Sequence, residues 1–345
     1  MNRRVITRVV LLLVTAVSLY LLLPKVLDVL SSWPQLRGIN LLWLGLAVCF
    51  EALAFVALWT LQRIALGTRS WFAVGTSQLA ANAAGSIIPG GGAASGAVQF
   101  GMLVRAGVPA ERVASGLTAS AAATTAAIFA LPVVATIAGL GGAAAPGSLH
   151  KVAYIGAAAF VLLGLAIVTS LVWDRPLLAV GRGARTAAGW IGQRQRLEDL
   201  PARLLVQRDG IRRAVATHPF VAGLAAIGKW GFDYLVLICV LEGLAIHAEP
   251  TLVLLAYAAA ALLALIPLTP GGLGFVEAGL TGLLIVAGVG AGEAAAATLA
   301  YRLVSYWLPL PAGLAGYWLG RRRYGSPGRD DANASPECST AVRSE

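Results

Sequence analysis

Opposite charges stand in two neighbouring apolar segments near the end of the sequence. Glu277 follows the turn-forming letters TPGG, and Arg302 lies in the next apolar segment, in TLAYRLVSYW. An ionisable side chain at membrane depth costs roughly 2.5–3.5 kcal/mol, so each needs a partner, water or a function. If the two segments pack as a hairpin, Glu277 and Arg302 pair or flank a polar cavity. Arg302 there attracts a phosphate, and Glu277 attracts a cationic headgroup or a coupling proton.

Other ionisable residues in the apolar segments offer less chemistry. Lys229 and Asp233 stand four residues apart, where they neutralise each other along one helix face. Glu51 and Glu242 are isolated carboxylates. The three histidines have no metal-ligand spacing, and no GxxxxGK[ST] motif is present. We therefore expect no metal, no cofactor and no enzyme activity.

The sequence also contains an internal repeat, in which two tripeptides recur at one offset of 181 residues. Pro-Gly-Gly occurs at 89–91 and 270–272, and Ala-Gly-Val occurs at 106–108 and 287–289. Paired Gly/Pro-interrupted hydrophobic segments indicate a transport site between inverted repeats, although they can also be tight turns between short spans. The predicted substrate-binding residues are Pro89, Gly90, Gly91, Gln99, Thr269, Pro270, Gly271, Gly272, Glu277 and Arg302.

The elements that must position these residues are helices. Of the residues, 58% are hydrophobic and 12% charged, which excludes an ordinary soluble enzyme. The apolar runs suffice for roughly eight to ten membrane segments, and they lack the alternation of barrel strands. Runs 93–104 and 274–288 are too short to cross comfortably. We predict an all-α polytopic bundle with two re-entrant or broken helices at inverted repeats.

The positive charge reports topology. The net charge is +10, but the arginines gather at the N-terminus, in residues 174–217 and at 321–323. This bias places both termini and the loop 174–217 in the cytoplasm, in the inner membrane of a bacterium. It argues against a nucleic-acid partner and for anionic lipid headgroups at the inner face. A homo-oligomer or an envelope enzyme stays open as a partner.

The predicted domain organisation is simple. Residues 1–323 form one transmembrane domain, with the repeats around 71–173 and 251–320 and the arginine-rich cytoplasmic loop 174–217 between them. Residues 324–345, rich in Gly, Pro, Ser and charge, are expected to be a disordered cytoplasmic tail.

The segments IPLTPGGLGFVEAGL and LAYRLVSYWLPLPAG resemble the family named for the transmembrane region of lysylphosphatidylglycerol synthases, also called flippase-like membrane proteins. The resemblance spans about residues 10–320, and its sharpest motif is Thr269 to Glu277 with the downstream pair Tyr301 and Arg302. The upstream motif PGGGAASG lacks the acidic residue and nearby arginine that many members carry. The resemblance implies two re-entrant elements and a role in moving or handling phospholipid or lipid-linked material.

Three functions are compatible with these sequence features. The leading one is a flippase-like protein that moves or handles phospholipid or lipid-linked substrate across the cytoplasmic membrane. A secondary transporter for a small polar solute or ion suits broken helices equally well. The third is a non-transporting accessory protein of an envelope lipid or glycan enzyme.

Overall fold

The computed structural model describes residues 39–88, 91–139, 218–265 and 270–325, with the single positions 158 and 162. Every regular element in these ranges is a helix, which confirms the all-α prediction. The predicted first span at 6–23 and the loop 174–217 lie outside these ranges. So do the residues of the predicted tail beyond 325, whereas Tyr324 is the last residue of a helix.

The first half of the described chain contains a long helix, a medium helix, a short helix and a second long helix. Local capping fixes their ends: Asn40 accepts a hydrogen bond from Leu42 N, and Gly67 closes the first helix with φ +60°. The four helices are α3 (Leu41–Leu66), α4 (Trp71–Ile87), α5 (Gly91–Arg105) and α6 (Ala110–Gly139).

The second half repeats this order. Proline occupies the first turn of three of its helices, where a missing N–H costs nothing. A five-residue π-helical turn joins the last two α-helices. The elements are α10 (Pro219–Gly243), α11 (Pro250–Leu263), η2 (Pro270–Gly272), α12 (Phe275–Val286), α13 (Ala291–Arg302), η3 (Leu303–Trp307) and α14 (Pro309–Tyr324).

Residues that are 181 positions apart make equivalent backbone hydrogen bonds in the two halves, just as they repeat in the sequence. At the end of α5, the N–H of Val108 donates to the carbonyl of Leu103 at 3.1 Å, and at the end of α12 that of Val289 donates to Leu284 at 3.0 Å. The glycines between, Gly107 and Gly288, have φ +89° and +96°. Each half therefore ends its short helix with the same left-handed turn before the next helix begins.

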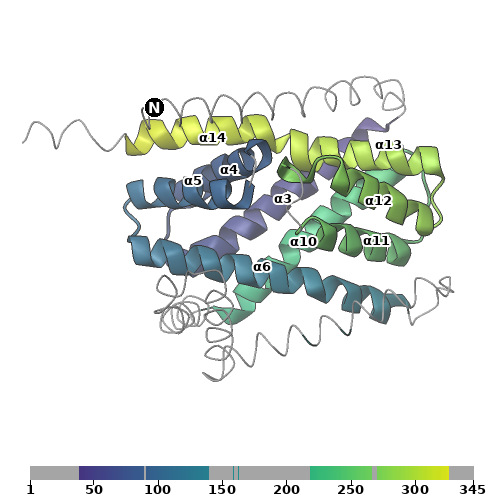
Figure 1. Cartoon of the computed structure of the whole chain (residues 1–345), viewed down its shortest axis with the longest axis horizontal. Coiled ribbons are helices and arrows are strands. Elements are labelled where there is room, and N and C mark those ends of the chain that lie inside the picture. The colour runs from purple at the N-terminus through teal and green to yellow at the C-terminus, as the bar shows by residue number, and fades with distance from the viewer. Residues whose placement is uncertain are drawn as a thin grey trace, which may run out of the picture.

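Packing between the halves is reciprocal. Helix α3 packs along α10, its counterpart at the same offset. Helix α4 packs on α14, and its counterpart α11 packs on α6. Because α6 and the α13–α14 segment are themselves counterparts at this offset, the contact of α4 with α14 corresponds to the contact of α11 with α6. Figure 1 shows α4 and α5 at one end and α11 and α12 at the other, with α3 and α10 crossing between them.

The short helices agree with the sequence prediction. Helix α5 has 15 residues and α12 has 12, which correspond to about 22 and 18 Å of helix at 1.5 Å per residue. A hydrocarbon core is about 30 Å thick, so neither helix alone spans it.

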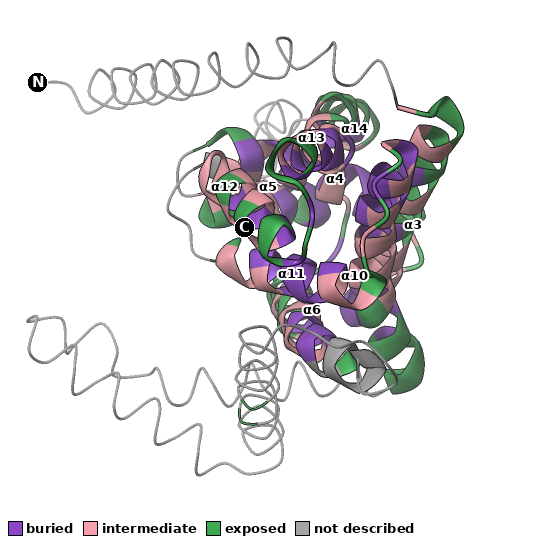
Figure 2. Cartoon of the chain, turned by 90° about the vertical axis from the view of Figure 1, so that its right-hand side faces the viewer, coloured by how far each residue is buried: buried purple, intermediate pink, exposed green. Residues whose placement is uncertain are grey.

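The surface of the bundle is apolar where the helices face outward. Large apolar side chains on the outer faces of α3 and α10 are exposed, whereas buried residues face the neighbouring helices (Figure 2). Small residues allow the close contacts inside: Gly313 of α14 lies so near Leu79 and Ala83 of α4 that a Cβ atom there would overlap both. An apolar exterior around close-packed small residues is what lipid solvation requires.

Candidate functional site

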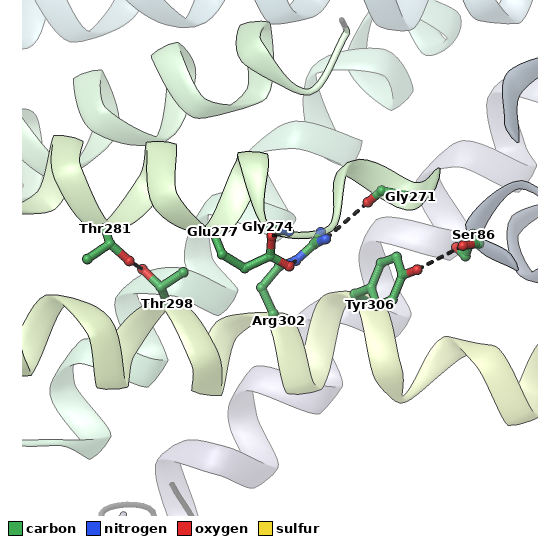
Figure 3. A network of polar contacts seen from close by, with 8 residues as sticks. All are labelled: Ser86, Gly271, Gly274, Glu277, Thr281, Thr298, Arg302 and Tyr306. Carbon is green, nitrogen blue, oxygen red and sulfur yellow. Dashed lines mark hydrogen bonds and ion pairs between the residues drawn. The ribbon is translucent and has the colours of Figure 1, made fainter. Parts of the chain in front are cut away.

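Glu277 and Arg302 form an ion pair inside the bundle. Glu277 lies in the first turn of α12, where its Oε2 accepts a hydrogen bond from Gly274 N at 2.6 Å. Its Oε1 accepts one from Arg302 Nε, at the end of α13, at 2.8 Å. The two side chains are only 16% and 11% exposed. The structure therefore shows the pairing that the sequence raised as one alternative (Figure 3).

The Pro-Gly-Gly turn completes this arrangement. Gly271 has φ +60°, and its carbonyl accepts a hydrogen bond from Arg302 Nη2 at 3.1 Å. A Cβ atom at Gly271 would overlap the Tyr306 ring and hydroxyl, so only glycine lets the turn come this close. The Tyr306 ring lies under the Arg302 guanidinium, 4.4 Å from ring centroid to Cζ, and its hydroxyl donates to the carbonyl of Ser86 at 2.9 Å. The turn of the second half thus touches the end of α4 in the first half.

A cavity of about 350 Å³ lies beside this pair. It is bounded by α3, α4, α10, α11, η2, α12, α13 and η3, so both halves contribute to its wall. Its polar and charged lining includes Glu51, Gln78, Asn82, Lys229, Asp233 and Arg302. Charged and polar side chains in a cavity of an otherwise apolar helical bundle give a hydrophilic group a place to bind.

A second polar cluster in the cavity lining is centred on Asp233 of α10. Its Oδ2 accepts from the Tyr257 hydroxyl at 2.6 Å and lies 3.5 Å from Lys229 Nζ, and its Oδ1 accepts from the Tyr301 hydroxyl at 3.1 Å. The Asp233 carboxylate therefore has three donors from three helices within hydrogen-bonding distance. Tyr301 directly precedes Arg302, so this dipeptide contacts both polar clusters.

The predicted site residues divide into groups. The structure brings Gly271, Glu277 and Arg302 together around one turn. Gly272, with φ +71°, belongs to the same turn, and Pro270 begins the short helix η2. Pro89, Gly90 and Thr269 lie outside the described residues, and Gly91 begins α5.

Gln99 occupies a different place from the Glu277–Arg302 pair. It is buried, and its Nε2 donates to Gln62 Oε1 at 3.0 Å and to Gln78 Oε1 at 2.8 Å. Gln78 lines the cavity, so Gln99 stands one side chain behind the cavity wall. These three amides link α3, α4 and α5 to one another.

Sequence reasoning missed the meeting of Glu51 with Asp233. From the sequence alone, Glu51 is an isolated carboxylate, and Lys229 and Asp233 neutralise each other along one helix face. The structure places all three in one cavity wall, with the Asp233 carboxylate shared by two tyrosines from other helices. One signal was present, because the repeat offset maps Glu51 onto position 232, next to Asp233.

Metal binding finds no support in this site. Within the described ranges, no three His, Cys, Asp or Glu side chains gather closely enough to hold a metal ion. The functional groups of this site are ion pairs and hydroxyl groups.

Three of the described helices are long and apolar enough to cross a membrane: α3, residues 110–132 of α6, and α10. Together with the exposed apolar side chains on their outer faces, they define an integral membrane protein of the α-helical class. The chain belongs to the family described as "Lysylphosphatidylglycerol synthase TM region", which it matches over residues 6–313.

A curated relative agrees with this assignment. It is a "UPF0104 membrane protein" of Methanothermobacter thermautotrophicus, 36% identical over 110 residues. The match covers 31% of this chain and 31% of that protein, so the chain spans about a third of the relative's length.

Proposed function

We propose that this protein moves or handles phospholipid or lipid-linked substrate across the bacterial cytoplasmic membrane, as a transporter and not as an enzyme. The observation that carries the proposal is the polar cavity shared by both halves, with Arg302 in its wall. Membership of a family named for a lipid synthase's membrane region supports a lipid-related role.

The cavity suits a headgroup. Its volume of about 350 Å³ is near the lower end of ligand pockets, which hold about 300–1,000 Å³. That volume admits a phosphate-bearing headgroup while the acyl chains stay in lipid. The hydrogen bonds to Glu277 and Gly271 use two of the five N–H donors of Arg302, and a phosphate would take others.

Movement across the membrane follows from the two halves. The common offset and the reciprocal helix contacts support repeats of opposite orientation, and the short helices α5 and α12 support re-entrant elements. In this proposal both termini lie in the cytoplasm, because the arginines concentrate there. Rocking of the halves about the cavity would then open it to one leaflet and then to the other.

A secondary transporter for a small polar solute is the second candidate. The observation that favours it is the same volume, because about 350 Å³ also accommodates a free solute with a phosphate or carboxylate group. The two candidates share the Arg302 contact and differ in whether acyl chains accompany the headgroup.

Reconstitution into liposomes tests the proposal. A fluorescent phospholipid in the inner leaflet should become accessible to an impermeant quencher faster with protein than without it. Arg302→Gln should abolish the acceleration, whereas Arg322→Gln, an exposed arginine at the end of α14, should retain it. Uptake of labelled solutes without lipid movement would favour the second candidate. Absence of both, with co-purification of an envelope enzyme, would favour the accessory role.

A further inference from the structure

A carboxyl group with no assigned role lies in the cavity wall. Glu51, in the middle of α3, is 8% exposed, and its Oε2 is buried with no hydrogen-bond partner among the described residues. It lines the same cavity as Asp233 of α10. Two carboxylates that share one cavity repel each other unless one of them holds a proton.

The neighbouring groups decide which of the two carboxyls holds it. Asp233 accepts hydrogen bonds from Tyr257 and Tyr301 and lies beside Lys229, so both of its oxygens already face donors. Glu51 has no comparable set of donors. A neutral Glu51 can donate its proton to Asp233, which turns a repulsive contact into a hydrogen bond.

The charges around the cavity lead to the same assignment. The ionisable groups that line the cavity with Glu51 come from α10, α11, α13 and η3. Glu277 of α12 is counted with them because it is paired with Arg302, which lines the cavity. They are Lys229, Asp233, Tyr257, Glu277, Tyr301, Arg302 and Tyr306. Lys229 neutralises Asp233, and Arg302 neutralises Glu277. Among these described groups only Glu51 is left without a counter-charge, and one proton brings the sum to zero.

We propose that Glu51 and Asp233 form a proton-binding site in which Glu51 carries the proton at neutral pH, and that its release to cavity water couples transport to a proton gradient. The coupling rests on the proposed function, whereas proton binding does not. Release leaves two carboxylates in the cavity wall, of which only Asp233 has a lysine beside it. Because Glu51 lies on α3 and Asp233 on α10, that repulsion acts directly across the interface of the two halves.

Infrared spectroscopy of the purified full chain tests proton binding without any transport. At neutral pH the wild type should show a protonated carboxyl band that disappears at alkaline pH. Glu51→Gln should remove the band. Glu242→Gln should leave it unchanged, because Glu242 is partly exposed beside His247. Absence of the band in the wild type, or its persistence in Glu51→Gln, overturns the proposal.

A second measurement covers the case in which Glu51→Gln fails to fold. An apolar carbodiimide adds to a protonated carboxyl in apolar surroundings to give an N-acylurea, and peptide mass spectrometry locates it. Wild-type protein at neutral pH should carry the label on Glu51 and not on Glu242. Labelling elsewhere with Glu51 unmodified overturns the assignment, as does stabilisation of the protein by sodium in place of protons.

Coupling is tested in liposomes with an imposed pH gradient. Wild-type lipid movement should accelerate with the gradient, and the Glu51→Gln rate should be independent of it. A protonated band with gradient-insensitive movement overturns the coupling. A protonated band with no lipid movement at all refutes the proposed function and leaves the proton site standing.

Discussion

Replacing Glu277 by glutamine removes the ion pair with Arg302 and keeps the other hydrogen bond of this residue. The glutamine amide oxygen can still accept from Gly274 N, so the first turn of α12 keeps its cap. What disappears is the counter-charge of Arg302, whose side chain is 11% exposed. The substitution therefore measures what it costs to leave one largely buried guanidinium without a counter-charge.

The structure sets the size of the effect. Removing one partner of a buried pair costs about 3–5 kcal/mol. Arg302 keeps its bond to the Gly271 carbonyl and its contact with the Tyr306 ring, which places the expected loss near about 3 kcal/mol. Removing both charges should recover about 2 kcal/mol, because contacting residues couple by roughly 0.5–3 kcal/mol.

The assay is equilibrium unfolding in mixed detergent micelles, applied to Glu277→Gln, Arg302→Gln and the double variant. The partly exposed carboxylate Glu242, changed to Gln, is the matched control and should unfold like the wild type. Losses below about 1 kcal/mol in both single variants, with no coupling between them, would refute the buried pair, since exposed pairs give only that much.

The same variants separate a structural role from a transport role. If the pair serves structure alone, the double variant should regain both stability and lipid movement. If it serves transport, Glu277→Gln should abolish lipid movement in folded protein, and the double change should not restore it. Wild-type transport and stability in both the single and the double variant would mean that these residues do not form the site.

Three further predictions follow from turns, packing and charge. Gly271→Ala should destabilise the protein by about 1–3 kcal/mol in the same unfolding assay, because φ is +60° and a Cβ atom would overlap Tyr306. Gly313→Ala should cost about 1–3 kcal/mol through overlap with α4, whereas Gly282→Ala, with open space at its Cβ position, should not; equal effects would contradict the packing. A cysteine at Gln193 should react with impermeant reagents only after the cells are opened, and one at Ser148 should react in intact cells; labelling of Gln193 from outside would overturn the topology.

Much of the secondary structure could be predicted from the sequence. Helix class follows from hydropathy, because lipid offers the backbone no hydrogen-bond partner outside its own helix. The ends of the short helices α5 and α12 follow from local letters: glycine at 107 and at 288 supplies the positive φ that closes each one. The shared offset of 181 residues then shows in both the letters and the bonds, since each turn depends only on residues within a few positions.

The proximity of Glu277 and Arg302 could also be predicted from the sequence. The two residues lie on successive short segments, and a hairpin of adjacent helices brings such residues together with few alternatives. The exact bonds were not within reach, because the contact of Arg302 with the Gly271 carbonyl needs the left-handed turn and the nearby Tyr306 ring in place.

Only the tertiary structure decided how the remaining polar residues meet. Glu51 comes from α3, far in the chain from α10 and α11, which carry Asp233 and Tyr257, and their common cavity depends on how each helix is rotated about its axis. Nearly uniform apolar sequences barely specify that rotation, because a polar residue in them can face lipid, a neighbour or a cavity. Close packing of small residues between α3 and α10 and between α4 and α14 sets it, through contacts that no local pattern encodes.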